Sequence, residues 1–214
     1  MEIVVRKAKE EDIPFLGEIA AAGFSPKTRV SFGKDLTKTA AIFSDFFRIG
    51  FFPCEHTVVA TVGGKVAGFS TVKFEDKGFP VWKLSQIFRK RLGILGGLRA
   101  LLILLWLYQE PFDEKTQVFW EMLAVHEDYR SMGIGTKIIQ ETYSYSLTTG
   151  RREILGFVVR GNRAEGLYRR LGMILEPPNF RLAWLSQLLY NFRGYHKLIW
   201  PLKAEQLEKT GTRD

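Results

Sequence analysis

The sequence predicts an α/β fold in which a mixed central sheet is flanked by helices. Strand-like and helical segments alternate along the chain, and residues 63–64 form a two-glycine turn between two strand-like runs. An apolar run at residues 117–125 is followed by a glycine-bearing turn and an amphipathic helical segment. With 214 residues, 46% of them hydrophobic and 14% aromatic, the chain can bury a substantial core. We therefore expect one domain over residues 1–214 rather than a disordered chain.

The first part of the chain predicts a strand, two helical regions and an antiparallel hairpin. Residues 3–6 indicate a short strand, and the acids at 10–12 stand where a helix start favours negative charge. Residues 36–47 carry an apolar, aromatic stripe at helical spacing. Runs 56–62 and 65–74 flank the glycine pair and predict the hairpin. The aromatic residues of this part can be core or can line an acceptor pocket: Phe43, Phe46, Phe47 and Phe51.

The second part predicts a helix, a strand and two further strands. The helix begins after the glycine-bearing turn and runs to about Thr149, with Gly150 placed to end it. Residues 153–159 indicate the next strand, and residues 173–176 and 195–202 supply the last two. The polar tail after Lys203 is expected to fray.

Residues 77–116 predict a helical, apolar insertion between the third and fourth strands. The run 92–108 is apolar apart from Arg99. It is shorter than the roughly twenty residues of a membrane-spanning helix. A single crossing would also place strands of one sheet on opposite sides of a bilayer. We therefore expect no transmembrane span.

The insertion is apolar on more than one side, so a helix there must be covered on more than one face. The sequence leaves four covers open: the sheet, the apolar segment 182–190, a second copy of the chain in a homodimer, or a membrane interface. Basic residues at 89–91 stand beside the apolar run and could touch anionic lipid. One helix face carries Ile94, Leu95, Leu98, Leu101, Leu102 and Leu105, and the other side carries Ile103, Leu104 and Leu107.

Composition narrows the classes of function. The formal net charge of +8 suits an anionic cofactor, and no nucleic-acid-binding module or interleaved aromatic–basic pattern accompanies it. We therefore expect no nucleic-acid partner. A single cysteine, Cys54, excludes an internal disulfide, and the first residues lack the features of a signal peptide, which predicts a cytoplasmic protein. No His, Cys and acid cluster has metal-ligand spacing, so no metal is expected.

The stretch from residue 117 to 140 predicts an anion site. The apolar strand ends at Val125 and leads to Arg130-x-x-Gly133-x-Gly135, directly before the amphipathic helix. Glycines let a ligand approach the backbone closely, and the N-terminus of a helix carries partial positive charge and unpaired N–H groups. Arg130 and the Thr136 hydroxyl add donors. This arrangement resembles the acetyl-CoA pyrophosphate loop of the GNAT acyltransferases.

A second segment strengthens that resemblance. Residues 162–172 resemble the second motif of the GNAT family, N-x-x-A-x-x-x-Y-x-x-x-G. Ala164, Tyr168 and Gly172 match in spacing, whereas Asn162 stands one position late and Gly161 occupies its slot. The resemblance covers residues 3–202. It implies the GNAT fold, with acetyl-CoA as co-substrate.

The resemblance also implies roles for particular residues. The pantetheine arm of the cofactor would pair with the backbone of 123–125, where the fourth and fifth strands of the family splay apart, and an N–H near Leu123 would stabilise the oxyanion. Tyr168 would protonate the leaving thiolate; the alternative is a tyrosine packed between helix and sheet. Asn162 would bond the pantetheine arm, cap a helix, or do both. The cofactor-binding residues expected are Leu123, Ala124, Val125, Arg130, Ser131, Met132, Gly133, Ile134, Gly135, Thr136 and Asn162.

Glu121 is the predicted catalytic base. It interrupts an apolar strand, and alternation places it on one face with Phe119, Leu123 and Val125. A carboxylate there needs a polar cavity or a partner. The alternative is a structural salt bridge. His126 is the competing base because histidine titrates in the useful range, although it lies past the strand end.

These patterns predict an N-acetyltransferase that passes an acetyl group from acetyl-CoA to a primary amine by direct attack in a ternary complex. The acceptor, a small molecule or a protein amine, is left open. Two alternatives stand beside this prediction. One is a non-catalytic acyl-CoA sensor or docking domain, and the other is an acyltransferase for a longer acyl chain or a hydrophobic acceptor.

Overall fold

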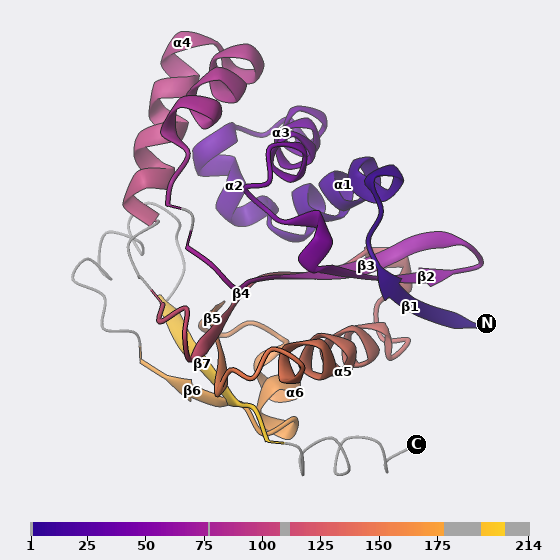
Figure 1. Ribbon diagram of the computed structural model, residues 1–214. Helices are drawn as coiled ribbons and strands as arrows, with labels where there is room; N and C mark the ends of the chain where they lie inside the picture. The colour runs from indigo at the N-terminus through magenta and orange to yellow at the C-terminus, as the bar shows by residue number, and fades with distance from the viewer. Residues whose placement is uncertain (1, 77, 108–111, 178–193, 204–214) are drawn as a thin grey trace.

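The computed structural model describes residues 2–76, 78–107, 112–177 and 194–203 (Figure 1). Seven strands form one sheet in the order β1-β2-β3-β4-β5-β7-β6. Only β4 and β5 run parallel, so the predicted mixed sheet is confirmed. The strands are β1 (Ile3–Lys7), β2 (Thr57–Val62), β3 (Lys65–Lys73), β4 (Gln117–Val125), β5 (Glu153–Val159), β6 (Ile174–Glu176) and β7 (Tyr195–Pro201).

Helices cover both faces of the sheet. Figure 1 shows one group of helices above the sheet and a second group below it. The upper group is α1 (Ile13–Gly23), α2 (Ser25–Phe32), α3 (Leu36–Arg48) and α4 (Val81–Leu107). The lower group is α5 (Ile134–Leu147) and α6 (Glu165–Arg170). Short 3-10 turns occupy Glu10–Asp12, Cys54–His56 and Glu127–Tyr129.

Local chemistry explains several element boundaries. The Asp35 carboxylate accepts a hydrogen bond from the Lys38 N–H and caps the start of α3. Gly63 and Gly64 both have positive φ, which a tight two-residue hairpin requires, and the predicted hairpin is confirmed. Helix α2 was not predicted, because its sequence contains few apolar residues and shows no helical stripe.

A β-bulge divides β4 into two parts. Thr71 of β3 faces Met122, whereas Val72 faces Trp120, so Glu121 is the extra residue. The bulge interrupts the alternation of faces. Trp120 packs in the cluster on the α5 side, while Met122 packs in the cluster under α1 and α3.

The prediction that Glu121 shares a face with Leu123 and Val125 is therefore wrong. Leu123 and Val125 pack toward α5, against the cluster that contains Ile134 and Ile138. The Glu121 side chain pairs with Lys73, whose ammonium lies over the rings of phenylalanines in the opposite cluster. An extra residue in a strand reverses the period of two for every residue after it.

The predicted helical insertion is confirmed as α4, between β3 and β4, but it is not one straight helix. Gly93 has φ 75° and ψ −175°, which breaks the helix into two segments. Phe88 of the first segment is fully buried against Phe32 and Phe46, so α2 and α3, rather than the sheet, cover this side. The proposed cover from residues 182–190 and the tail after residue 203 lie outside the described residues. Within the described ranges, no helix combines the length and the hydropathy needed to cross a membrane.

Candidate active site

The parallel strands β4 and β5 part halfway along their length. Their pairing runs from Gln117–Glu153 to Trp120–Gly156 and extends no further among the described residues. At Gly156 an added Cβ would lie 3.2 Å from the Trp120 Cβ, so glycine permits the last close contact. Beyond it, residues 121–125 pair with no strand on the β5 side among the described residues, so their backbone edge there is open within that part of the chain. The prediction that the fourth and fifth strands splay apart is confirmed.

A pocket of about 90 Å³ lies at this parting. It is lined by residues of β4, β5, α6 and β7, together with Phe24 from the junction of α1 and α2. Four of the predicted site residues line it together: Glu121, Leu123, Asn162 and Tyr168. The fold thus brings residues more than forty positions apart in the sequence to one cavity.

Tyr168 is held as a neutral phenol on the pocket wall. Only 8% of the residue is exposed, and its ring packs edge-on against Trp120 with 5.7 Å between centroids. Trp120 is itself fixed by a 2.7 Å hydrogen bond from its indole N–H to the Ser70 hydroxyl. Burial raises the pKa of Tyr168 to about 12. Within the described part of the chain its hydroxyl has no hydrogen-bond partner, so it remains a donor for a ligand at neutral pH.

Glu121 forms an ion pair with Lys73, and both side chains are largely buried. The Lys73 ammonium also lies 4.5 Å from the centroid of the Phe51 ring. Glu121 therefore does form the salt bridge that was the alternative to a catalytic role. The same residue also lines the pocket where β4 and β5 part. Sequence reasoning missed Lys73. The available signal was a lysine at the end of an apolar strand that precedes the acid-bearing strand in the sheet.

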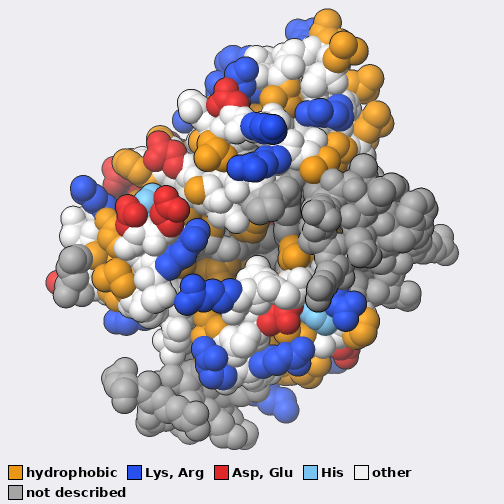
Figure 2. All heavy atoms as spheres, turned by 180° about the vertical axis from the view of Figure 1, so that it is seen from behind, with side chains coloured by type: hydrophobic (Ala, Val, Ile, Leu, Met, Phe, Trp, Pro, Cys, Tyr) orange, Lys and Arg blue, Asp and Glu red, His pale blue; other side chains and the backbone are white. Residues whose placement is uncertain are grey.

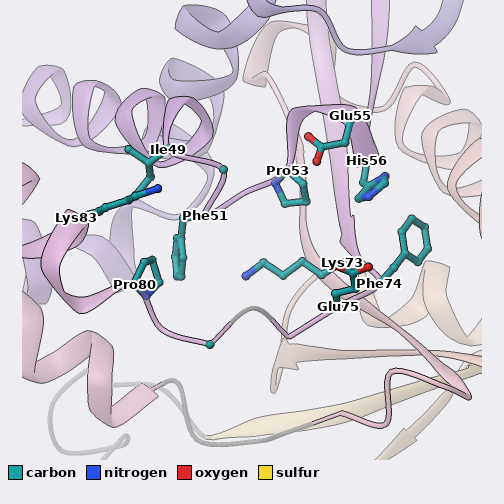
Figure 3. Close-up of a pocket in the computed structure, with 12 residues that line it drawn as sticks. Ile49, Phe51, Pro53, Glu55, His56, Lys73, Phe74, Glu75, Pro80 and Lys83 are labelled. Atoms are coloured by element: carbon teal, nitrogen blue, oxygen red, sulfur yellow. The ribbon is translucent and has the colours of Figure 1, made fainter.

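A larger cavity, of about 320 Å³, lies on the other side of this ion pair (Figure 3). In Figure 3 the Lys73 side chain extends across it toward Phe51, with Glu55 and His56 on one side and Lys83 on the other. Since Lys73 lines the larger cavity and its partner lines the smaller one, the ion pair stands between the two.

The glycine-bearing turn presents backbone N–H groups toward open space. Ser131 has φ 65° and Gly133 has φ 76°, and Gly133 caps α5 with no side-chain hydrogen bond. The first hydrogen bond of the helix joins the Lys137 N–H to the Gly133 carbonyl. Helix geometry therefore leaves the N–H groups of residues 134–136 available to an anion, and an added Cβ on Gly133 would meet nothing within 4 Å.

Neighbouring side chains hold this turn in place. Ile134 is 1% exposed and anchors the start of α5 in the core, while the Arg130 Nε–H donates to the Val125 carbonyl at 3.3 Å. An added Cβ on Gly135 would point at the Val125 side chain, 3.8 Å away. Gly133 thus opens the turn to solvent, whereas Gly135 faces the strand. Ser131 and Met132 are exposed beside them.

Asn162 lies in the segment that precedes α6. Its side-chain oxygen accepts a 2.9 Å hydrogen bond from the Ala164 N–H, which lies in the turn before the helix. The N-cap position of α6 is Ala164, which makes no side-chain cap hydrogen bond, so Asn162 is not the N-cap of this helix. Gly161, which occupies the slot of the family asparagine, has φ 81° and donates its N–H to the Glu165 carboxylate at 2.6 Å. Asn162 also lines the pocket, and a bond to the pantetheine arm stays a prediction.

The other residues considered for catalysis or for the acceptor pocket lie outside the small pocket where β4 and β5 part. His126 accepts a hydrogen bond from the Asp128 N–H at 3.3 Å and lines neither cavity. Burial raises the pKa of the Cys54 thiol, which makes it a poor nucleophile. Three aromatic residues proposed for an acceptor pocket are buried in the core, namely Phe43, Phe46 and Phe47, whereas Phe51 lines the larger cavity. The ranges that the structure describes contain no group of His, Cys, Asp and Glu that could hold a metal ion.

A mixed sheet parted between parallel strands, with a glycine turn at the start of the following helix, defines the acyl-CoA N-acyltransferase class. The sequence matches the model of the acetyltransferase (GNAT) family over residues 28–173. The chain belongs to this family. A comparison with curated proteins gave no match.

Solved structures support the same fold. An N-acetyltransferase from Staphylococcus aureus Mu50 is 18% identical with a TM-score of 0.59, covering 92% of this chain and 99% of its own. The protein yncA from Salmonella typhimurium, solved with its cofactor acetyl-CoA, is 13% identical with a TM-score of 0.57, covering 94% and 95%. The NatC complex bound to Gag peptide and CoA contains a chain that is 18% identical with a TM-score of 0.53, covering 95% and 100%. At these identities the likeness establishes the fold.

Proposed function

We propose that this protein transfers an acetyl group from acetyl-CoA to a primary amine by direct attack in a ternary complex. The observation that carries the proposal is the pocket where β4 and β5 part. It joins an open strand edge, a carboxylate and a buried phenol, and the same strand leads into the glycine turn of α5. A domain that only bound acyl-CoA would need neither Glu121 nor Tyr168 in that pocket.

The cofactor has a place for each of its parts. The pyrophosphate binds the N–H groups at the start of α5, with Arg130, Ser131, Met132 and the Thr136 hydroxyl around it. The pantetheine arm pairs with the open backbone edge of residues 123–125, as an added strand would, and Asn162 lies beside it. The net charge of +8 draws an anion of this kind toward the protein. Acetyl-CoA is the cofactor of the structurally similar yncA.

The chemistry is one acyl transfer. The amine nitrogen attacks the thioester carbonyl carbon, the new C–N bond forms, and the C–S bond breaks. A backbone N–H near Leu123 donates to the oxyanion. The amine gives up its proton to Glu121, directly or through water.

Tyr168 donates a hydrogen bond to the departing sulfur. A phenol with a pKa of about 12 is a weaker acid than a thiol, whose ordinary pKa is about 8.5, so it stabilises the thiolate without losing its own proton. Glu121 then releases the amine's proton to solvent and the coenzyme A thiolate takes up a proton, so the products are the amide and the free thiol.

The larger cavity offers the acceptor a route to Glu121. Lys73 closes one end of it, and the carboxylates of Glu55 and Glu75 lie among its walls. Negative groups attract a cationic amine, while Phe51 and Phe74 can pack on its carbon skeleton. A primary amine that enters here displaces the Lys73 ammonium from Glu121.

Thiol release from acetyl-CoA over a panel of amines tests the proposal. The panel contains small amines, polyamines and peptides with a free α-amino or lysine amine. We expect turnover with at least one class and formation of the matching amide by mass spectrometry. Tight binding of acetyl-CoA without turnover of any amine would make the protein a sensor. A preference for long-chain acyl-CoA over acetyl-CoA would reassign the donor.

A further inference from the structure

Helix α4 is a hairpin that projects from the domain. Its two segments meet at Gly93, and the second folds back on the first. An added Cβ on Gly97 would lie 3.1 Å from the backbone of Phe88 and Arg89, eight or more positions earlier in the chain, which only a reversed chain allows. In Figure 1 the turn of this hairpin lies at the end of the molecule farthest from the sheet.

One side of the hairpin is fixed to the domain. Leu84, Phe88 and Ala100 are fully buried, and Leu101 and Leu104 pack against the same cluster. Because both segments are anchored in this way, the opposite side is held at a defined orientation rather than hanging from a flexible loop.

The opposite side is apolar and exposed. Leu95 is 84% exposed, Ile94 77%, Trp82 74% and Leu98 55%. Seven of the twelve exposed large hydrophobic residues among the described ranges lie on this one helix, so the feature is a patch and not scattered surface. Figure 2 shows these orange side chains along the outer edge of the projection, with blue Lys and Arg side chains beside them.

The charges on α4 have one sign. Its 27 residues include five basic residues and no acid. Arg91 is paired with Asp45 of α3 at 2.8 Å. The other four, Lys83, Arg89, Lys90 and Arg99, are exposed and form no ion pair within the part of the chain that the structure describes. The apolar patch therefore has a positive rim.

We propose that the α4 hairpin docks on an anionic phospholipid surface. Its tip residues Ile94, Leu95 and Leu98 enter the boundary between headgroups and acyl chains, and Arg89 and Lys90 contact lipid phosphates. Apolar side chains with flanking cations and no acids match that surface in both hydrophobicity and charge. The docking is peripheral, because the helix breaks at Gly93.

Other occupants fit less well. A second copy would bring together two helices whose charged residues are all basic. Like charges at a contact oppose association. A nucleic acid would satisfy the cations but would leave the exposed leucines without an apolar partner. The inference is independent of the acetyltransferase chemistry, since the residues proposed to touch the lipid line neither cavity: Arg89, Lys90, Ile94, Leu95 and Leu98.

Vesicle co-sedimentation tests the proposal. Full-length protein is mixed with phosphatidylcholine vesicles that contain no phosphatidylglycerol or about one-third phosphatidylglycerol. We expect binding to the anionic vesicles and at least tenfold weaker binding to the neutral ones, and a marked loss at about 1 M salt, where the Debye length is about 3 Å. Arg89→Gln with Lys90→Gln should weaken binding about 25-fold at low salt, from about fivefold for each basic residue.

The apolar arm of the test uses Leu95→Gln with Leu98→Gln, which should weaken binding at least tenfold. Phe15→Gln is the matched control, because Phe15 is also about half exposed but lies on α1, and it should bind as the wild type does. Equal binding to both kinds of vesicle, or none, would overturn the proposal. So would binding that needs the two basic residues but not the two leucines, which indicates a general polyanion site. A dimer in light scattering that the leucine changes convert to a monomer, without vesicle binding, would assign the face to a second copy.

Discussion

The pocket at the parting of β4 and β5 and the outer face of α4 differ in shape, polarity and origin. The pocket is concave and small, and it brings together three polar side chains: Glu121 from β4, Asn162 from the loop after β5 and Tyr168 from α6. The α4 face is convex and broad, belongs to one element, and has no polar group directed to a single point. The pocket suits one small ligand held in a fixed geometry, whereas the face suits an extended surface. A catalytic site needs several polar side chains directed at one ligand, whereas a docking surface needs only sufficient area and complementary charge.

The two regions should therefore respond separately to mutation. Changes in the pocket should alter turnover and leave vesicle binding within about twofold, and changes on α4 should do the reverse for a water-soluble amine. The four predictions below, three substitutions and one pH dependence, concern the pocket and its glycine turn. Each includes vesicle binding as a second measurement, because a joint loss would break the comparison.

Tyr168→Phe should have the largest effect. We expect kcat to fall about 100-fold, because the phenyl ring keeps its packing on Trp120 but no longer donates to the leaving sulfur. The Kd for acetyl-CoA should change less than about twofold. Steady-state kinetics and cofactor titration measure both. An unchanged kcat would remove Tyr168 from the mechanism.

The same residue predicts a pH dependence. Burial raises the pKa of Tyr168 to about 12, so the neutral, donating phenol persists above the ordinary tyrosine value of about 10. We therefore expect pH–rate profiles to show no loss of kcat from phenol ionisation up to about pH 11, one unit below the raised pKa.

Glu121→Gln should lower kcat about 30-fold. The decrease is smaller than the usual effect of removing a general base, because the ion pair with Lys73 already weakens the carboxylate as a proton acceptor. The change also leaves the Lys73 ammonium without its anion, which is costly in a buried site. Lys73→Met combined with Glu121→Gln is the matched control, and it should recover thermal stability without recovering the rate. An unchanged kcat in Glu121→Gln would show that another group is the base.

Gly133→Ala should raise the KM for acetyl-CoA about tenfold, because an added methyl group enters the space before the start of α5 and strains a residue with positive φ. Gly135→Ala is the matched control. Its methyl group would point at Val125 at an ordinary contact distance, so KM should change less than about threefold. Equal effects of the two substitutions would contradict the assignment of the open side to Gly133.

Much of the fold and part of the site were predictable because they rest on local patterns. The hairpin at Gly63 and Gly64 follows from a turn that requires positive φ, and β5 was placed to the residue by its apolar run. The glycine turn before α5 follows from strand, glycine and helix in immediate succession. Asn162 was expected to cap a helix or to bind the pantetheine arm, and its side chain instead bonds the Ala164 N–H in the turn just before α6.

The sequence by itself determined the order of the strands, the helical regions other than α2, the family and the glycine turn, because each depends on patterns among residues close together in the chain. Only the tertiary structure decided the direction of Glu121, because one bulge residue against β3 reverses the alternation. It also decided the partner of Glu121, since Lys73 stands 48 positions earlier and meets it only across the sheet. The tertiary structure also decided which side of α4 is exposed. A helix apolar on two sides does not reveal which side its neighbours bury, and the fold of α2 and α3 settled that.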